Sequence, residues 1–429
     1  MSAELDDRAA DSDDEPLLAV ENLEKHFPVN TGMLDSIRFD PNARPVPFRL
    51  DDSRVRAVDG VSFDLRPGET LGVVGESGCG KSTLARTILQ LEEITDGTIR
   101  FDGVPVSELA DEQEFRKRVQ MVFQDPQSSL NARRKVGEII TDPLEGAGWP
   151  ADERRRRALE LLEQVGLERE YYNRYPHEFS GGQRQRINLA RALSINPDLV
   201  VCDEPVSGLD VSVQAQILDL MDDLQTEYGL TYLFISHDLS VVRYVADRVA
   251  VMYLGEFVEV APADRMFADP QHPYTQALLA SVPNPNPERP GVRSALSGDV
   301  PSATHPPRGC RFHTRCPEFI LPDGFDSAAY TSFDELLGDL RDGGLDVTGD
   351  AETVVTAYFD DPAVVPTEVR QAIDDAVDAV GRGDREAALE HLAPFESICQ
   401  RESPIIVAPD GTNHAVACHL KREDVGHGD

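Results

Sequence analysis

The sequence predicts an α/β fold in which a parallel β-sheet packs against helices, and three observations point to it. An apolar run at Thr70–Val74 meets a glycine-rich loop and then a helical stretch, Ser82–Leu91, which together make a strand, loop and helix unit. Further apolar runs with strand character follow at Leu199–Cys202, Tyr232–Ile235 and Arg248–Tyr253. A helical pattern separates the first two of these later runs. This alternation is typical of a parallel sheet.

The segment before the glycine-rich loop predicts a β subdomain of antiparallel strands. Leu17–Leu23 and Val61–Leu65 have strand patterns, and a polar, proline-dotted insertion from Asn30 to Arg54 separates them. We therefore expect a first β-layer that is interrupted by an insertion.

Residues 124–197 predict a mainly helical subdomain, with helices at Asp152–Val165 and Gly182–Leu193. A further helix follows the Leu199–Cys202 strand, because apolar residues recur there at i, i+4, i+7 and i+11. These residues are Val213, Ile217, Leu220 and Leu224.

The length and the linker composition predict more than one domain. We expect an acidic disordered tail at residues 1–15, a main domain at 16–270 and a C-terminal region at 271–429. A proline-rich linker at Ser281–Gly291 leads out of the main domain. Between the cysteine-bearing ends of the C-terminal region lies an acidic helical insertion at about 319–396, with no recognisable chemistry.

The charge of the 429-residue chain excludes nucleic acid as a natural partner, since the net charge is -36. Two interpretations remain: a surface suited to a high-salt cytoplasm, or a docking surface for a basic partner. The first is favoured because the acids are spread along the whole length. No apolar stretch approaches the roughly 20 residues of a membrane helix, so we expect a cytosolic chain.

A phosphate-binding loop is predicted by the pattern G-x-x-x-x-G-K-[ST] between a strand and a helix. Backbone N–H groups of such a loop converge on phosphate oxygens, Lys81 reaches the β and γ phosphates, and Ser82 offers its hydroxyl to Mg²⁺. The alternative, a coincidental glycine-rich turn, does not explain the strand and helix on either side. The loop with the residue that follows it consists of Gly75, Glu76, Ser77, Gly78, Cys79, Gly80, Lys81, Ser82 and Thr83.

Two carboxylates at the end of the Leu199–Cys202 strand predict hydrolysis. Asp203 is placed to bind Mg²⁺ beside the phosphates, and Glu204 to polarise the attacking water. Beside a phosphate loop, the alternative of two solvated strand-end acids is disfavoured.

Ser180, Gly181, Gly182 and Gln183, at the start of a helix before the carboxylate strand, resemble the signature motif of ABC transporter ATPases. The resemblance covers roughly Leu17 to Ala280. It implies a head-to-tail dimer in which ATP lies between the phosphate loop of one subunit and this motif of the other. A single phosphate loop and the absence of sustained heptads argue against a soluble ABC ATPase that acts on ribosomes or DNA. The signature motif and Glu204 argue against a P-loop kinase.

Four further residues match motifs of the same family. Gln124 resembles the glutamine that touches Mg²⁺ or water and senses the membrane partner, and His237 resembles the histidine that contacts the γ-phosphate. Asp210 resembles the residue that communicates across the dimer. Phe27 resembles the aromatic residue that stacks on adenine, which is usually tyrosine in the family.

Two later segments, Gln271–Leu279 and Gly309–Pro317, resemble the C-terminal region of oligopeptide and dipeptide importer ATPases. The resemblance implies two kinds of partner, namely membrane permease subunits and an extracytoplasmic substrate-binding protein. It also implies that the chain lies on the cytoplasmic face of the membrane. We expect the permease subunits to dock near Gln124. Two features resemble the second ATPase subunit of such systems: the long insertion that follows Phe27, and the glutamine at position 183. We therefore expect a heterodimer, although a homodimer remains open. Related importers carry peptides, nickel or glycosides, so the cargo also remains open.

Four of the six cysteines lie in the C-terminal region and predict a metal site: Cys310, Cys316, Cys399 and Cys418. Their spacing matches no common ferredoxin or zinc-finger pattern. The family resemblance favours a [4Fe–4S] cluster, while zinc, with His313, His414 or His419 contributing, and free thiols remain alternatives. Cys79 and Cys202 are expected to be packing residues.

Overall fold

The computed structural model describes residues 15–29, 37–39, 48–50, 54–109, 112–281, 298–343, 350–408 and 413–421. The chain forms two compact units. The first unit comprises Met1–Pro306 and Ile406–Ala417, and the second comprises Pro307–Ile405 and Cys418–Asp429. Within the described ranges, no helix combines the length and the apolar character needed to cross a bilayer.

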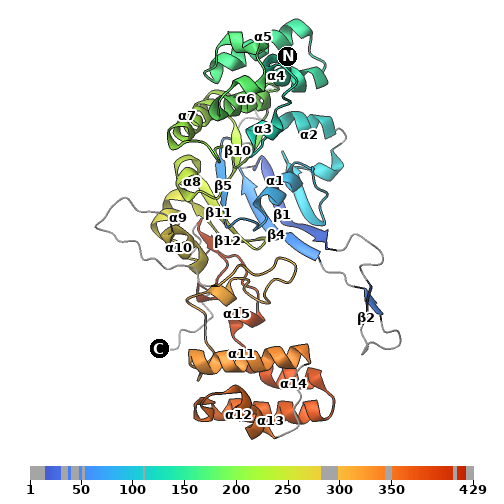
Figure 1. Ribbon diagram of the computed structural model, residues 1–429, viewed down its shortest axis with the longest axis vertical. Helices are drawn as coiled ribbons and strands as arrows, with labels where there is room; N and C mark the ends of the chain where they lie inside the picture. The colour runs from blue at the N-terminus through green and yellow to red at the C-terminus, as the bar shows by residue number, and fades with distance from the viewer. Residues whose placement is uncertain are drawn as a thin grey trace, which may run out of the picture. The chain divides into compact units, whose positions relative to one another are not determined.

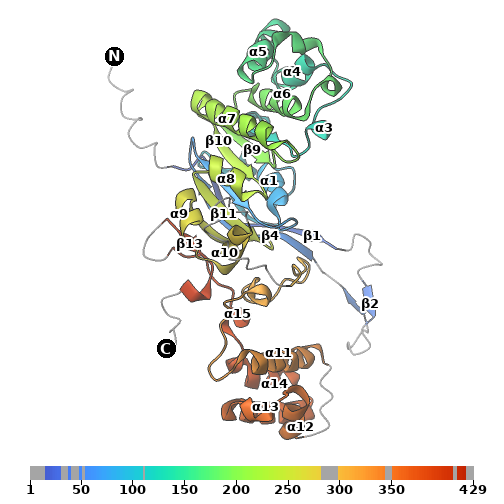
Figure 2. The same ribbon diagram turned by 60° about the vertical axis from the view of Figure 1, so that its left-hand side comes forward.

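The central sheet of the first unit has seven strands in the order β13-β12-β11-β5-β10-β9-β8 (Figures 1 and 2). Neighbours from β11 to β8 are parallel, whereas β12 and β13 are antiparallel additions at one edge. Strands β5, β9 and β10 are buried along their whole length, which explains why their sequences are continuous apolar runs. The strands are β5 (Thr70–Val74), β8 (Val119–Val122), β9 (Leu199–Asp203), β10 (Thr231–Ile235), β11 (Arg248–Tyr253), β12 (Glu256–Pro262) and β13 (Ala415–Val416).

A second sheet of the first unit is antiparallel, with the strand order β4-β1-β6-β7. Its strands are β1 (Leu18–Pro28), β4 (Arg54–Leu65), β6 (Asp96–Phe101) and β7 (Val104–Pro105). Both β1 and β4 are longer than the sequence predicted. Pairing continues through the polar stretch because register shifts at Leu23, Lys25 and His26 absorb the break in the alternating pattern. Between β1 and β4, β2 (Ile37–Phe39) and β3 (Phe48–Leu50) form a two-stranded sheet.

The helices of the first unit include a group, α4 to α6, that packs together as the helical subdomain (Figure 1). Helix α7 buries Ile217, Leu220 and Leu224, three of the four residues of its predicted apolar stripe. The helices are α1 (Lys81–Ile88), α2 (Glu112–Arg118), α3 (Pro126–Ser129), α4 (Val136–Gly146), α5 (Ala151–Gln164), α6 (Gly181–Leu193), α7 (Val211–Tyr228), α8 (Leu239–Val245), α9 (Ala263–Ala268) and α10 (Pro273–Ala280).

The second unit contains the acidic insertion, which forms helices around a core of its own. Asp326, Asp350 and Asp384 each cap the N-terminus of a helix by accepting a backbone N–H bond. Apolar faces that include Phe333 and Ile373 meet in that core. Helix α11 contacts α12 and α14, and α13 also contacts α12 and α14. The helices are α11 (Ser327–Asp342), α12 (Ala351–Tyr358), α13 (Thr367–Gly381), α14 (Arg385–Leu392) and α15 (Ile398–Arg401).

The compact units divide at a different place from the boundary expected at residue 271. Helix α10 and strand β13 both belong to the first unit. The reason lies in the pairing of β13 with β12, which returns a C-terminal segment to the edge of the central sheet (Figure 2). Most of the expected linker, residues 282–291, lies outside the described residues.

Candidate active site

The predicted phosphate loop connects β5 to α1 and wraps around the ammonium group of Lys81. The Lys81 Nζ atom donates to the carbonyl oxygens of Gly75 and Glu76, at 2.9 Å each, and the side chain is 6% exposed. Gly80 has a φ of 115°, and a Cβ there would lie 1.9 Å from the carbonyl oxygen of Ala57. Only glycine fits this turn. The loop thus places a cation and the N-terminus of α1 side by side, an arrangement suited to phosphate.

A hydroxyl and a carboxylate meet next to this loop. Ser82 Oγ donates to Asp203 Oδ1 at 3.0 Å, and Asp203 is 3% exposed at the end of β9. Burial raises the pKa of Asp203, and the charge of Glu204 adds to that effect, while the hydrogen bond from Ser82 opposes it. A divalent cation would stabilise the ionised carboxylate here, and both oxygens are of the type that Mg²⁺ prefers.

The carboxylate of Glu204 contacts residues that follow two other strands. The Gln124 Nε2 atom donates to Glu204 Oε2 at 2.8 Å, and His237 Nδ1 lies 3.0 Å from Glu204 Oε1. The Glu204 backbone is in the left-handed region, with a φ of 48°, and its N–H donates to the carbonyl of Ile235 at 2.9 Å. This conformation is uncommon outside glycine and marks a strained position.

The sheet order explains why these residues meet. Gln124, Glu204 and His237 follow β8, β9 and β10, and the phosphate loop follows β5. These four strands are consecutive neighbours in the sheet and run parallel, so their carboxyl ends share one edge. The structure therefore gathers Lys81, Ser82, Gln124, Asp203, Glu204 and His237 at one edge of one sheet.

The signature segment lies at an accessible helix N-terminus. Ser180 caps α6 by accepting from the N–H of Gln183, and the Gln183 side chain accepts from the N–H of Ser180. This capping box defines the start of the helix. Ser180 and Gly181 are exposed, as is Asp210 at the start of α7, so a partner chain can reach them.

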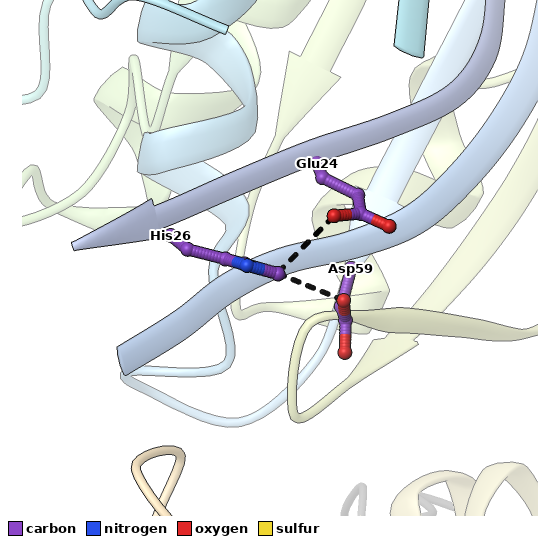
Figure 3. Close-up of side chains that lie close together, drawn as sticks. All are labelled: Glu24, His26 and Asp59. Carbon is purple, nitrogen blue, oxygen red and sulfur yellow. Dashed lines mark hydrogen bonds and ion pairs between the residues drawn. The ribbon is translucent and has the colours of Figure 1, made fainter. Parts of the chain in front are cut away.

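Phe27 lies near the end of β1, in the stretch beyond the predicted strand. The ammonium group of Lys25 is 4.6 Å from the centroid of its ring. On the same strand, His26 Nε2 lies 2.8 Å from Asp59 Oδ1 of β4 and 3.8 Å from Glu24 Oε2 (Figure 3). These contacts join β1 to β4 beside Phe27.

One partner of the phosphate loop did not emerge from the sequence. The N–H of Glu76 donates to the hydroxyl of Tyr274 in α10 at 3.0 Å. The only signal in the sequence was the His272-Pro273-Tyr274 motif, which served there as a family marker.

The four C-terminal cysteines all belong to the second unit and have free thiols. The N–H of Cys310 donates to the carbonyl of Cys399 at 2.7 Å. Burial raises the pKa of Cys310, and the neighbouring thiols raise it further; burial likewise raises the pKa of Cys316 to about 12 and of Cys418 to about 11. Across the described ranges, no three of these sulfur atoms lie within 4.8 Å of one another. Thiolates on one tetrahedral zinc ion are closer, at about 3.8 Å for Zn–S bonds of about 2.3 Å.

A phosphate loop, a carboxylate strand and an exposed signature helix, ordered around one parallel sheet with an antiparallel sheet and a helical subdomain, define an ABC-type ATPase. Family models agree with this class. The ABC transporter model matches residues 58–207, and the model for the oligopeptide/dipeptide transporter C-terminal region matches 258–319. A domain of unknown function (DUF8228) matches 323–411.

Curated relatives give the finer assignment. The oligopeptide transport ATP-binding protein AppF of Bacillus subtilis is 50% identical over 310 residues, which cover 71% of this chain and 90% of that protein. The dipeptide transport ATP-binding protein DppF of Escherichia coli is 50% identical over 305 residues, covering 70% and 87%. The chain belongs to this family of oligopeptide and dipeptide transport ATP-binding proteins, and it is an ATPase.

Proposed function

We propose that the chain hydrolyses ATP to drive the import of oligopeptides or dipeptides through membrane permease partners. The convergence of Lys81, Asp203 and Glu204 at one sheet edge carries the hydrolytic part. The match over residues 258–319 and the names of the relatives support a peptide as cargo. Nickel and glycosides are the alternative cargoes to be tested.

The proposed role of each site residue is consistent with its position. Lys81 and the loop N–H groups would hold the phosphates, while Ser82, Asp203 and Gln124 would hold Mg²⁺, which would supply positive charge next to the transferred group. Glu204 takes a proton from the attacking water. His237, in contact with Glu204, orients that carboxylate and reaches the γ-phosphate.

The signature segment acts in a dimer. Ser180 and Gly181 are exposed at the N-terminus of α6, where the positive end of the helix dipole favours an anion. In a head-to-tail pair these groups face the γ-phosphate held by the other subunit, and Asp210 lies at the same interface. A second ATPase subunit of the same family is the proposed partner, and a second copy of this chain is the alternative.

The permease is proposed to dock beside Gln124. A hollow of about 330 Å³ next to it is lined by apolar side chains that include Leu89, Leu91 and Phe123. Leu91 is 56% exposed and Phe123 is 37% exposed, so the hollow presents apolar surface that a partner can cover. Phe123 immediately precedes Gln124, so a partner that displaces Phe123 on binding also displaces Gln124 at the catalytic edge. The chain is then peripheral, on the cytoplasmic face of the membrane.

Uptake by a reconstituted transporter tests this function. The chain is assembled with its permease subunits, second ATPase and extracytoplasmic binding protein in vesicles loaded with Mg-ATP. We expect ATP-dependent accumulation of a labelled dipeptide or oligopeptide and none when the chain carries Glu204→Gln. Accumulation of nickel or a glycoside, with no peptide uptake, would overturn the peptide assignment and leave the ATPase assignment intact.

The cysteine group is proposed to hold a [4Fe–4S] cluster through Cys310, Cys316, Cys399 and Cys418. Four thiols from three segments supply the ligands that such a cluster requires, and their spacing fits one tetrahedral zinc ion poorly. Arg311 and Arg315, both 7% exposed, place positive charge in the segment, which favours an anionic centre. His414 is engaged by Glu259 in the first unit, so it is a poor zinc ligand. The cluster would supply one-electron redox chemistry or a structural link.

Metal analysis of anaerobically purified protein checks this prediction. We expect about four irons per chain, a brown colour and absorbance near 400 nm, by the stoichiometry and chemistry of such clusters. Cys399→Ser should lower the iron content, whereas Cys202→Ser, a buried cysteine of β9, should leave it unchanged. Stoichiometric zinc without iron would contradict the cluster.

A further inference from the structure

The hydroxyl of Tyr274 contacts the phosphate loop, although Tyr274 lies far from the loop in the sequence. Tyr274 is 0% exposed, and its hydroxyl accepts from the N–H of Glu76 at 3.0 Å. Its ring packs on that of Tyr253 at the end of β11, with 4.7 Å between the ring centroids. Since β11 is the neighbour of β5, Tyr274 contacts both the end of β11 and the loop that follows β5. The loop backbone is therefore held at Glu76.

Tyr274 is in turn fixed by the residue that caps its helix. The Nδ1 atom of His272 accepts from the N–H of Tyr274 at 3.0 Å. Burial lowers the pKa of His272 to about 3, although a hydrogen bond to the backbone of Ala417 opposes that effect. The imidazole is consequently neutral at physiological pH, and Nδ1 keeps the lone pair that the cap requires.

A buried carboxylate ties this cap to the C-terminal segment. Glu259 of β12 is 0% exposed and accepts from the N–H of His272 at 2.9 Å. Its other oxygen lies 2.6 Å from His414 Nε2. Next to His414, β13 pairs with β12, where Val416 is opposite Glu259, and the N–H of Ala417 donates to Val258 at 2.9 Å. A buried charge with these partners is costly to disturb.

We propose that Tyr274 is a positioning residue for the phosphate loop, and that the segment His414–Ala417 holds it there through Glu259 and His272. The bond to Glu76 orders one peptide of the loop before nucleotide arrives. Less ordering then remains to be done when phosphate binds, and this raises affinity. The groups that carry out hydrolysis, Glu204 and His237, are outside this chain of contacts, so the effect falls on binding rather than on turnover.

Tyr274→Phe in the full-length chain tests the proposal, because it removes one oxygen atom and keeps the ring. The affinity for a fluorescent ATP analogue should fall about threefold to tenfold, the effect of one lost hydrogen bond. The rate at saturating ATP should stay within about twofold, because transition-state contacts are kept. Tyr232→Phe is the matched control: its buried hydroxyl donates to Met221 in the same unit and away from the loop. An unchanged affinity in Tyr274→Phe, or an equal loss in both variants, overturns the proposal.

A double-mutant cycle tests the second half. His414→Gln should weaken ATP binding in the same direction as Tyr274→Phe, because it loosens Glu259. In the Tyr274→Phe background it should add little, since both changes act through one hydroxyl. Full additivity of the two effects would show that His414 acts independently of Tyr274 and would overturn the assigned route.

Discussion

Glu204 shows how backbone geometry prepares a side chain for chemistry. Its φ of 48° turns the chain after β9, and its carboxylate contacts Gln124 and His237 beyond that turn. The bond from its N–H to Ile235 of the adjacent strand fixes the turn. Strain of this kind costs on the order of 1–3 kcal/mol and persists where the surrounding structure enforces it. Position 204 therefore requires an unusual backbone conformation as well as an acidic side chain.

Glu204→Gln separates binding from hydrolysis. The amide keeps an oxygen that can accept from Gln124 and adopts the same backbone, so ATP affinity should be retained. It has no proton-accepting carboxylate, so steady-state hydrolysis should fall about 100-fold or more. Equilibrium ATP titration and phosphate release measure the two quantities, with Asp238→Asn, the N-cap of α8 on the neighbouring loop, as the control. Normal turnover in Glu204→Gln would remove the assignment of the base.

The elements that were predicted best from the sequence are strands that are buried because they lie in the middle of the central sheet. Strands β9, β10 and β11 are buried as parallel or central strands, and each appeared as an apolar run within about one residue of its bounds. Because chemistry-bearing residues follow such strands directly, the catalytic edge could be predicted with them. The signature helix was equally clear, since its capping box is local in sequence.

Elements that depend on distant partners could not be predicted. The end of β1 is polar, and it forms a strand only because β4 pairs with it through register shifts. The two residues of β13 have no pattern of their own, and the edge of β12 defines them. The same applies to Tyr274, whose contact with Glu76 spans 198 positions of sequence. Local periodicity carries no information about such pairings.

The whole chain carries a net charge of -36, and this charge has a consequence for stability. Acids are exposed in both units; on α13 alone, Asp374, Asp375 and Asp378 face solvent. Repulsion among like charges destabilises a compact state, and salt screens it. The Debye length falls from about 10 Å at 0.1 M to about 3 Å at 1 M ionic strength, so screening is nearly complete by then.

Thermal unfolding in KCl checks this consequence. We expect Tm to rise by about 5 °C or more between about 0.1 M and about 1 M KCl and then to flatten, because screening saturates. Replacing Asp374, Asp375 and Asp378 by Asn removes three negative charges from one helix, and should raise Tm at low salt and reduce the further gain from KCl. A continued linear rise beyond 1 M would point to salt exclusion from the surface instead. A Tm that does not respond to KCl would contradict the high-salt interpretation and favour an acidic surface kept for a basic partner.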